Sequence, residues 1–195
     1  MPTPADQPET KAGYMKDYLT ALRRLPAEKN RAVLQGLEDL VSEIENASRS
    51  AWLPISANLR VTNAVFRKLG SAEANEFYAQ WIRRQIETPV WTNLIRGALA
   101  LFGHDPGSLA QWMPAAFGLM YRNYGQWKVQ RIADTHVQLE LTEMPTELAT
   151  NVYWQQSVRS GLFALYRLTR VDGEIVLEAG SNVHRTMVLT LRWHR

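Results

Sequence analysis

The four histidines have the widest chemical range of any residues in this sequence, because an imidazole acts as acid, base or metal ligand near neutral pH. They are His104, His136, His184 and His194, and no two have the i, i+4 spacing of a helical metal site. We therefore expect surface histidines and no bound metal. His104 deserves a test because it follows a predicted helix ending at Gly103, where the helix dipole favours a protonated imidazole. A polar turn residue is the simpler interpretation.

Carboxylates and hydroxyls that could perform catalysis are present, but they are not arranged for it. The carboxylates lie on the polar side of one amphipathic segment and around one strand end: Glu38, Asp39, Glu43, Glu45, Glu140 and Glu143. Ser157 and Ser160 fall within a helical pattern and not on the strand-to-helix turn of a Gly-x-Ser-x-Gly motif. Cysteine and glycine-rich phosphate-binding motifs are absent from the sequence. We predict no catalytic residues and do not expect an enzyme.

Aromatic residues are the most prominent feature of the sequence, which contains seven tryptophans. A large core explains them, but an apolar chamber with a few polar groups is also typical of a small-molecule site. Gly161 lies inside a helical pattern, where glycine costs about 1 kcal/mol relative to alanine. It indicates close approach either to the sheet, which we favour, or to a ligand. The candidate ligand-binding residues are Trp81, Trp91, Trp112, Phe117, Tyr121, Trp154, Gly161 and Tyr166.

Composition limits the class of protein. With 195 residues, 46% hydrophobic and 21% charged, the chain is long enough to bury a core without disulfide bonds. A net charge of +3 is small for a nucleic-acid-binding protein, so we do not expect that partner. No stretch approaches the roughly 18 apolar residues of a membrane span, and the start, "MPTPADQPETKAGY", lacks the apolar core of a signal peptide. We predict a disordered leader over residues 1–11, a single domain over 12–195, and a cytoplasmic location.

Apolar residues recur at helical spacing through the first part of the chain. This pattern predicts about six helical segments, over residues 14–25, 26–47, 56–69, 71–86, 90–103 and 108–125. Gly70 and Gly125 stand at predicted helix ends, and Pro114 predicts a kink in the last segment. Trp52 and Pro54 fall in a predicted loop.

The period changes to two after Gly125, which predicts strands. The order is two strands over 126–132 and 136–144, a helix over 145–170, and two strands over 171–180 and 185–193. Two hairpins separated by one helix predict a four-stranded antiparallel sheet with helices on one face. Val137, Leu139 and Leu141 should face those helices. The predicted fold class is α+β, a helical lobe followed by a β-β-α-β-β sheet.

This order of elements resembles the heme-NO-binding (H-NOX) superfamily, which includes vinyl-reductase-type small-ligand domains and the TRAPP vesicle-tethering subunits. The stretches "LFGHDPGSLAQWMPAAFGLMYRNYG", "SVRSGLFALYRL", "DGEI" and "LRW" also resemble an uncharacterised bacterial family of regulator-like proteins. The resemblance covers residues from about 50 to 195. It implies a ligand-binding or regulatory role.

The resemblance also implies where heme would bind, and this sequence departs from that pattern. In heme-binding members, a histidine on the helix before the first hairpin ligates iron, and a Tyr-x-Ser-x-Arg stretch holds the propionates. Here the segment from Ser108 to Asn123 has no histidine, and no Tyr-x-Ser-x-Arg occurs. We therefore expect no heme and no other cofactor. The remaining members of the superfamily imply a hydrophobic cavity or an acyl-chain tunnel.

Two functions remain open. The first is a non-enzymatic sensory or regulatory protein that binds a small hydrophobic molecule, for example a lipid or acyl chain, in a pocket between the helical lobe and the sheet. The second is a protein–protein interaction module, an adaptor or homodimer, with a fully packed core. Its docking surface would be the exposed side of the last strand or the helix from Tyr14 to Leu25.

Overall fold

The computed structural model describes residues 7–88, 92, 95, 97, 105–178 and 185–194. The chain forms two compact units that interleave along the sequence. Unit 1 comprises Met1–Ala74 and Gly118–Tyr124, and unit 2 comprises Asn75–Phe117 and Gly125–Arg195. The predicted helix over 90–103 falls almost entirely outside the described residues, as do Trp91, His104 and His184.

Unit 1 contains the helices α1 (Ala12–Leu22), α2 (Ala27–Leu34), α3 (Glu38–Asn46) and the first half of α4 (Ile55–Ile86). Met15, Tyr18 and Leu22 are buried because their spacing of three and four residues places them on one face of α1. This face is part of the core of unit 1. The apolar face of the helix from Tyr14 to Leu25 is therefore used in the core, and the docking surface on this helix stays a prediction.

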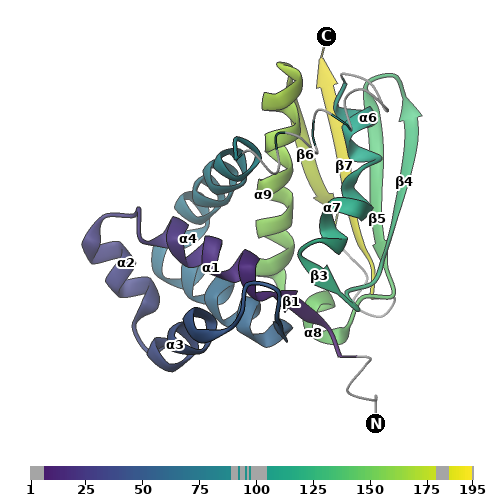
Figure 1. Ribbon diagram of the computed structural model, residues 1–195. Helices are drawn as coiled ribbons and strands as arrows, with labels where there is room; N and C mark the ends of the chain where they lie inside the picture. Colours follow the sequence, from purple (N-terminus) through teal and green to yellow (C-terminus); the bar gives the residue numbers. More distant parts are fainter. Residues whose placement is uncertain are drawn as a thin grey trace. The chain divides into compact units, whose positions relative to one another are not determined.

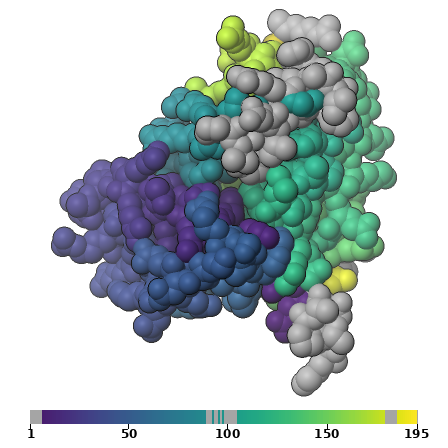
Figure 2. All heavy atoms as spheres, viewed as in Figure 1, coloured from purple at the N-terminus to yellow at the C-terminus, as the bar shows by residue number. Residues whose placement is uncertain are grey.

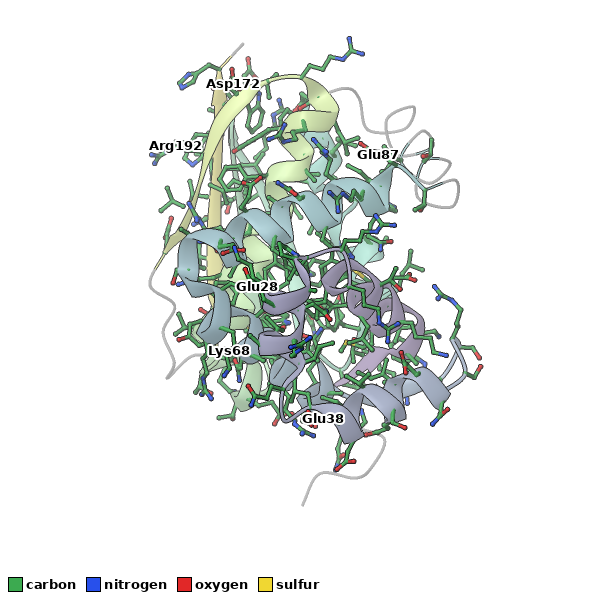
Figure 3. The ribbon with its side chains drawn as sticks, turned by 90° about the vertical axis from the view of Figure 1, so that its left-hand side faces the viewer. Glu28, Glu38, Lys68, Glu87, Asp172 and Arg192 are labelled. Carbon is green, nitrogen blue, oxygen red and sulfur yellow. The ribbon has the colours of Figure 1, made fainter. Side chains whose placement is uncertain are left out.

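Two glycines with positive φ divide the helices of this part of the chain. The predicted helix over 26–47 is two helices, because Gly36 has a φ of 78° between α2 and α3. The Gly36 N–H donates to Oε1 of Glu38, at the start of α3 (Figure 3), and this bond lowers the pKa of Glu38. The predicted break at Gly70 is confirmed, since its φ of 77° and ψ of 163° interrupt α4.

Three short strands complete unit 1 as a small antiparallel sheet of order β2-β1-β3: β1 (Glu9–Lys11), β2 (Trp52–Pro54) and β3 (Tyr121–Arg122). The Lys11 ammonium and the Arg122 guanidinium lie 4.3 Å and 4.8 Å from the centre of the Trp52 ring, so cations from two strands hold an aromatic side chain of the third. The disordered leader predicted through residue 11 is thus too long. The loop predicted at Trp52 is in fact a strand.

Unit 2 contains the predicted four-stranded antiparallel sheet, with strand order β4-β5-β7-β6 (Figure 1). The strands are β4 (Gln126–Ala133), β5 (His136–Thr142), β6 (Asp172–Glu178) and β7 (Met187–His194). The two hairpins join through β5 and β7, where Leu139 faces Leu189. The predicted α+β class and the joined sheet are therefore confirmed.

The two faces of this sheet differ as the alternation predicts. Val137, Leu139 and Leu141 are fully buried, and α6 (Pro106–Ala110) packs against β5. Helix α9 (Val152–Thr169) packs against β6 and β7. On the opposite face Arg192 points away from the helices (Figure 3), 3.3 Å from the carboxylate of Glu174. The sheet thus has one covered apolar face and one polar face.

Two predicted helices are shorter than expected. The segment 108–125 contains α6, α7 (Met113–Gly118) and strand β3, so its break precedes Pro114 and does not occur as a kink at that residue. The segment 145–170 is divided into α8 (Thr146–Ala149) and α9, because the Asn151 side chain caps α9 by accepting from the Trp154 N–H at 2.9 Å. Within the described residues, no helix is both long and apolar enough to cross a membrane.

Candidate functional site

Helices α4 and α9 approach each other closely within unit 2. A Cβ added at Gly161 of α9 would lie 3.0 Å from Cγ1 of Ile82 on α4, which is closer than ordinary van der Waals contact. The three nearest heavy atoms all belong to Ile82. The sequence correctly predicts that Gly161 allows a close approach, but the neighbour is a helix and not the sheet.

A group of three neutral polar residues, one buried and two half-buried, lies at this helix contact. Oγ of Ser160 is 2.9 Å from Oδ1 of Asn75 and 2.9 Å from the backbone oxygen of Gln156. Ser160 is only 2% exposed. Oε1 of Gln156, one helical turn before Ser160, is buried without a hydrogen-bond partner. We call Asn75, Gln156 and Ser160 the polar cluster.

Aromatic side chains of α4 adjoin the polar cluster along the chain. Phe77 and Trp81 stack at 6.2 Å between ring centres, and Tyr78 lies 6.0 Å from Trp81. Asn75, Tyr78 and Ile82 have the i, i+3, i+7 spacing of one helical face. Helix α4 therefore carries buried aromatic residues next in sequence to the Asn75 that it hydrogen-bonds to α9, and apolar surface beside uncharged polar groups is typical of a small-molecule site.

The other predicted ligand-binding residues are distributed over several places in unit 2. Trp154 is fully buried in the first turn of α9, whereas Trp112 is half-buried. Phe117 makes an edge contact of 5.1 Å with Trp127 of the edge strand β4. Of the predicted residues, Trp81 and Gly161 come from the two helices of the α4–α9 contact.

Tyr166 has a structural task in the sheet. Its hydroxyl lies 2.6 Å from the carbonyl oxygen of Glu174 and 3.0 Å from that of Arg192, so it joins β6 to β7. Burial raises the pKa of Tyr166 well above its ordinary value, and the hydroxyl therefore remains a donor. Gly173 makes room for this ring, since a Cβ there would lie 2.9 Å from Cζ of Tyr166.

Tyr121, by contrast, belongs to unit 1. Its hydroxyl lies 3.3 Å from that of Tyr14, and its ring lies 5.5 Å from the Tyr14 ring and 6.1 Å from the Tyr124 ring. Sequence order alone grouped Tyr121 with the tryptophans of the preceding segments. The division of the chain into two units separates them.

A charged group fixes the start of α6 on the sheet. The Asp105 carboxylate accepts from the Ser108 N–H at 3.1 Å and the Ser108 hydroxyl at 2.6 Å, and it lies 3.4 Å from the Arg131 guanidinium. Burial raises the pKa of Asp105, but the Ser108 hydrogen bonds and the Arg131 charge outweigh burial and leave it lowered. This carboxylate is thus held ionised in a structural role.

Both described histidines lie on strands of the four-stranded sheet. His136 and His194 are on β5 and β7, opposite Arg192 and Asp172 in register. Among the described residues, no group of three His, Asp, Glu or Cys side chains could hold a metal ion.

Two residues of the polar cluster were missed by the sequence analysis. Asn75 and Gln156 carry no motif, and Asn75 is 85 positions from its partner Ser160. A neutral polar residue within an apolar helical stripe is the one available signal, and it does not identify a partner.

Comparison with solved structures identifies the fold. An H-NOX protein from K. algicida, in the Fe(II) unliganded form, superposes with a TM-score of 0.64 at 8% identity, covering 95% of this chain and 97% of that one. An oxygen-binding H-NOX domain related to soluble guanylate cyclases gives 0.62 at 11% identity, covering 95% of both chains. A variant of T. tengcongensis H-NOX gives 0.62 at 11% identity, covering 95% of this chain and 98% of that one.

The chain therefore has an H-NOX-like fold, as the element order predicted. No protein-family model matches the sequence. A search of curated protein sequences also finds no match. The likeness is thus one of architecture, which alone does not transfer a ligand.

Among the described residues, the segment before the first hairpin offers no heme-ligating histidine, and His104 lies outside the described residues. Helices α6 and α7, directly before the first hairpin, carry no histidine. The first turn of α6 instead lies on the sheet, since a Cβ at Gly107 would be 2.8 Å from Cγ2 of Val137 and 2.9 Å from Cη2 of Trp193. No step of any mechanism is therefore assigned to heme.

Proposed function

We propose that this protein is a non-enzymatic sensory domain that binds a small hydrophobic molecule in unit 2. A lipid or acyl chain is the ligand class that we propose. The observation that carries the proposal is the α4–α9 contact, where Ser160 of α9 meets Asn75 of α4, and buried aromatic side chains including Trp81 follow Asn75 along α4. The H-NOX-like fold supports a sensory role, because one solved neighbour is an oxygen-binding domain related to soluble guanylate cyclases.

The chemistry of the cluster agrees with binding and not with catalysis. Asn75, Gln156 and Ser160 are uncharged, and none is a proton-transfer group at neutral pH. A reaction needs a nucleophile, a base and a group that stabilises developing charge in mutual contact. The described residues of the α4–α9 contact offer hydrogen bonds and apolar surface, which orient a ligand without transforming it.

Native mass spectrometry of the purified protein tests the proposal directly. We expect a population heavier than the bare chain by the mass of a copurified lipid or acyl compound. Added ligand should also raise the free energy of unfolding, by about 2.7 kcal/mol when it is present at one hundred times its dissociation constant. A bare mass together with no thermal shift from fatty acids, fatty alcohols or tetrapyrroles would refute the proposal.

We propose an interaction module or homodimer as the second candidate, because β4 is an exposed edge strand (Figure 2). Its Ile132 is 47% exposed, and an open edge pairs readily with a strand of another chain. Size-exclusion chromatography with light scattering should then show a dimer that Ile132→Lys disrupts. A monomer at every concentration would refute this candidate and leave the first one intact.

A further inference from the structure

The four-stranded sheet has two edge strands, β4 and β6 (Figure 1), and one hydrogen bond shows which of their backbone groups point outward. The Trp193 N–H donates to the Thr135 carbonyl oxygen, so this opposite pair of β7 and β5 is hydrogen-bonded. Hydrogen-bonded and non-hydrogen-bonded pairs alternate along an antiparallel ladder. Carried through the register of the sheet, this alternation points the backbone groups of Trp127, Val129 and Arg131 away from β5, toward the open side of β4.

The β6 edge is closed by a side chain of the same chain. The alternation points the backbone groups of Ile175 away from β7, and Nε of Arg159 donates to the Ile175 carbonyl oxygen at 2.6 Å. The Arg159 guanidinium also lies 5.5 Å from the centre of the Phe163 ring, which holds it in place. A charged side chain on an edge is one of the ways in which proteins prevent the addition of a strand.

The β4 edge has no such cover. Among the described residues, none forms a hydrogen bond with the outward backbone groups of β4. Its two cations each have a carboxylate from the same chain close by: Lys128 lies opposite Glu140 in register, and the Arg131 guanidinium lies 3.4 Å from the Asp105 carboxylate. A second β4 strand therefore does not meet the repulsion of a bare basic strand.

We propose that β4 pairs antiparallel with β4 of a second copy of this chain, with the two-fold axis at Val129, so that two sheets join into one. Opposite residues of such a pair face the same side of the sheet, so the axis must pass through a residue. With the axis at Val129, this residue meets the partner's Val129, and Trp127 meets the partner's Arg131. Because the β6 edge is closed, the association ends at two copies. This inference rests on the second candidate function and specifies its partner and register.

The side chains of β4 favour this register over its neighbours. An axis at Lys128 or Arg131 would place two like charges directly opposite each other, which destabilises a cross-strand pair. An axis at Gln130 would pair Trp127 with the irregular end of β4, where the register shifts after Arg131. The axis at Val129 instead uses all three outward residues and places each Trp127 ring beside an Arg131 guanidinium, as a cation–π pair requires.

The sequence contains no cysteine, so single substitutions can map the register by disulfide cross-linking. In a hydrogen-bonded opposite pair the Cα atoms are about 5.5 Å apart, within reach of a disulfide. A residue one position from the axis lies about 8 Å from its own copy, which is too far. We therefore expect oxidised Val129→Cys to run as a dimer on a non-reducing gel. Lys128→Cys and Gln130→Cys should not exceed the background of Val176→Cys, a control at a position that is 40% exposed on β6.

A proline at the same position gives a second readout. Val129→Pro removes an N–H that points outward, so the hydrogen bonds between β4 and β5 remain, whereas both bonds of the central pair between the copies are lost. We expect the dimer dissociation constant, measured by sedimentation equilibrium, to rise at least about tenfold, with an unchanged circular dichroism spectrum. Val129→Ala is the matched control, because it keeps the N–H and should weaken the dimer far less.

The outcomes separate this inference from the candidate function on which it rests. A wild-type dimer that cross-links best at another position, or that survives Val129→Pro, overturns the inference and leaves the second candidate standing. A wild-type monomer at every concentration refutes both, while the proposed binding of a ligand in unit 2 is judged by its own experiment. If Val129→Pro does not fold, the cross-linking pattern alone decides.

Discussion

Because Gly161 lies close to Ile82, the effect of Gly161→Ala on the free energy of unfolding should depend on the side chain at position 82. Replacing a helical glycine by alanine ordinarily raises the free energy of unfolding by about 1 kcal/mol. Here the added methyl group would lie 3.0 Å from Cγ1 of Ile82. That separation is roughly 0.5–1 Å shorter than the best carbon–carbon distance, and such overpacking costs about 1–3 kcal/mol. We therefore expect Gly161→Ala to leave stability unchanged or to lower it by up to about 2 kcal/mol.

The same substitution should become stabilising once the obstructing atom is removed. In an Ile82→Ala background Cγ1 is absent, so Gly161→Ala should stabilise by about 1 kcal/mol through helix propensity alone. The double-mutant cycle then gives a coupling energy of about 1–3 kcal/mol. Urea denaturation of the four proteins at equilibrium measures it. Gly118→Ala is the control, because no atom lies within 4 Å of the Cβ added there.

An additive cycle would refute the reasoning. If Gly161→Ala stabilised the wild type as much as it stabilised Ile82→Ala, the two helices would not be in close contact at Gly161. The polar cluster would then lose its position between α4 and α9, since Ser160 is the neighbour of Gly161 in sequence. The slope of the free energy of unfolding against urea concentration should be equal in the four proteins. A variant with a different slope has a changed unfolded ensemble, and its value is not used in the cycle.

Three further changes test other parts of the structure. Tyr166→Phe leaves two strand carbonyls without their hydroxyl donor and should lower the free energy of unfolding by roughly 1–3 kcal/mol, measured in urea. Gly70→Ala should cost roughly 1–3 kcal/mol, because a φ of 77° with a ψ of 163° is accessible essentially only to glycine; an unchanged Tm would contradict that conformation. Asp105 has a lowered pKa, because Ser108 and Arg131 outweigh burial, so its stabilisation is complete above about pH 4 and is lost as the pH falls through the folded-state value. Asp105→Asn should therefore weaken the loss of stability in acid, and identical acid unfolding curves would rule this out.

The sequence has an H-NOX-like fold without the Tyr-x-Ser-x-Arg stretch that holds the heme propionates in heme-binding members. A fold at 8–12% identity is maintained by the pattern of apolar positions and turns, whereas a cofactor depends on a few specific side chains. In this chain α6 contacts the sheet at Gly107 and offers no imidazole. The α4–α9 contact has instead Gly161 and the neutral amides of Asn75 and Gln156.

Errors in the predicted elements have local causes. Gly36 separates α2 from α3, and Asn151 caps the start of α9, although apolar periodicity continues through both positions. Periodicity indicates which side of a segment is buried, but it does not indicate where the backbone turns. The strands β1, β2 and β3 are three residues long or shorter, too short for alternation to be detected. Each of them exists because a distant segment completes its hydrogen bonds.

The sequence by itself determined the α+β class, the change to strands after Gly125, the break at Gly70, and the buried face formed by Val137, Leu139 and Leu141. These features follow from local periodicity and backbone freedom, which are properties of neighbouring residues. Only the tertiary structure decided that Gly161 meets Ile82 and that Asn75 meets Ser160. Such contacts join residues far apart in the chain, and their geometry depends on how two helices pack, which no local pattern records.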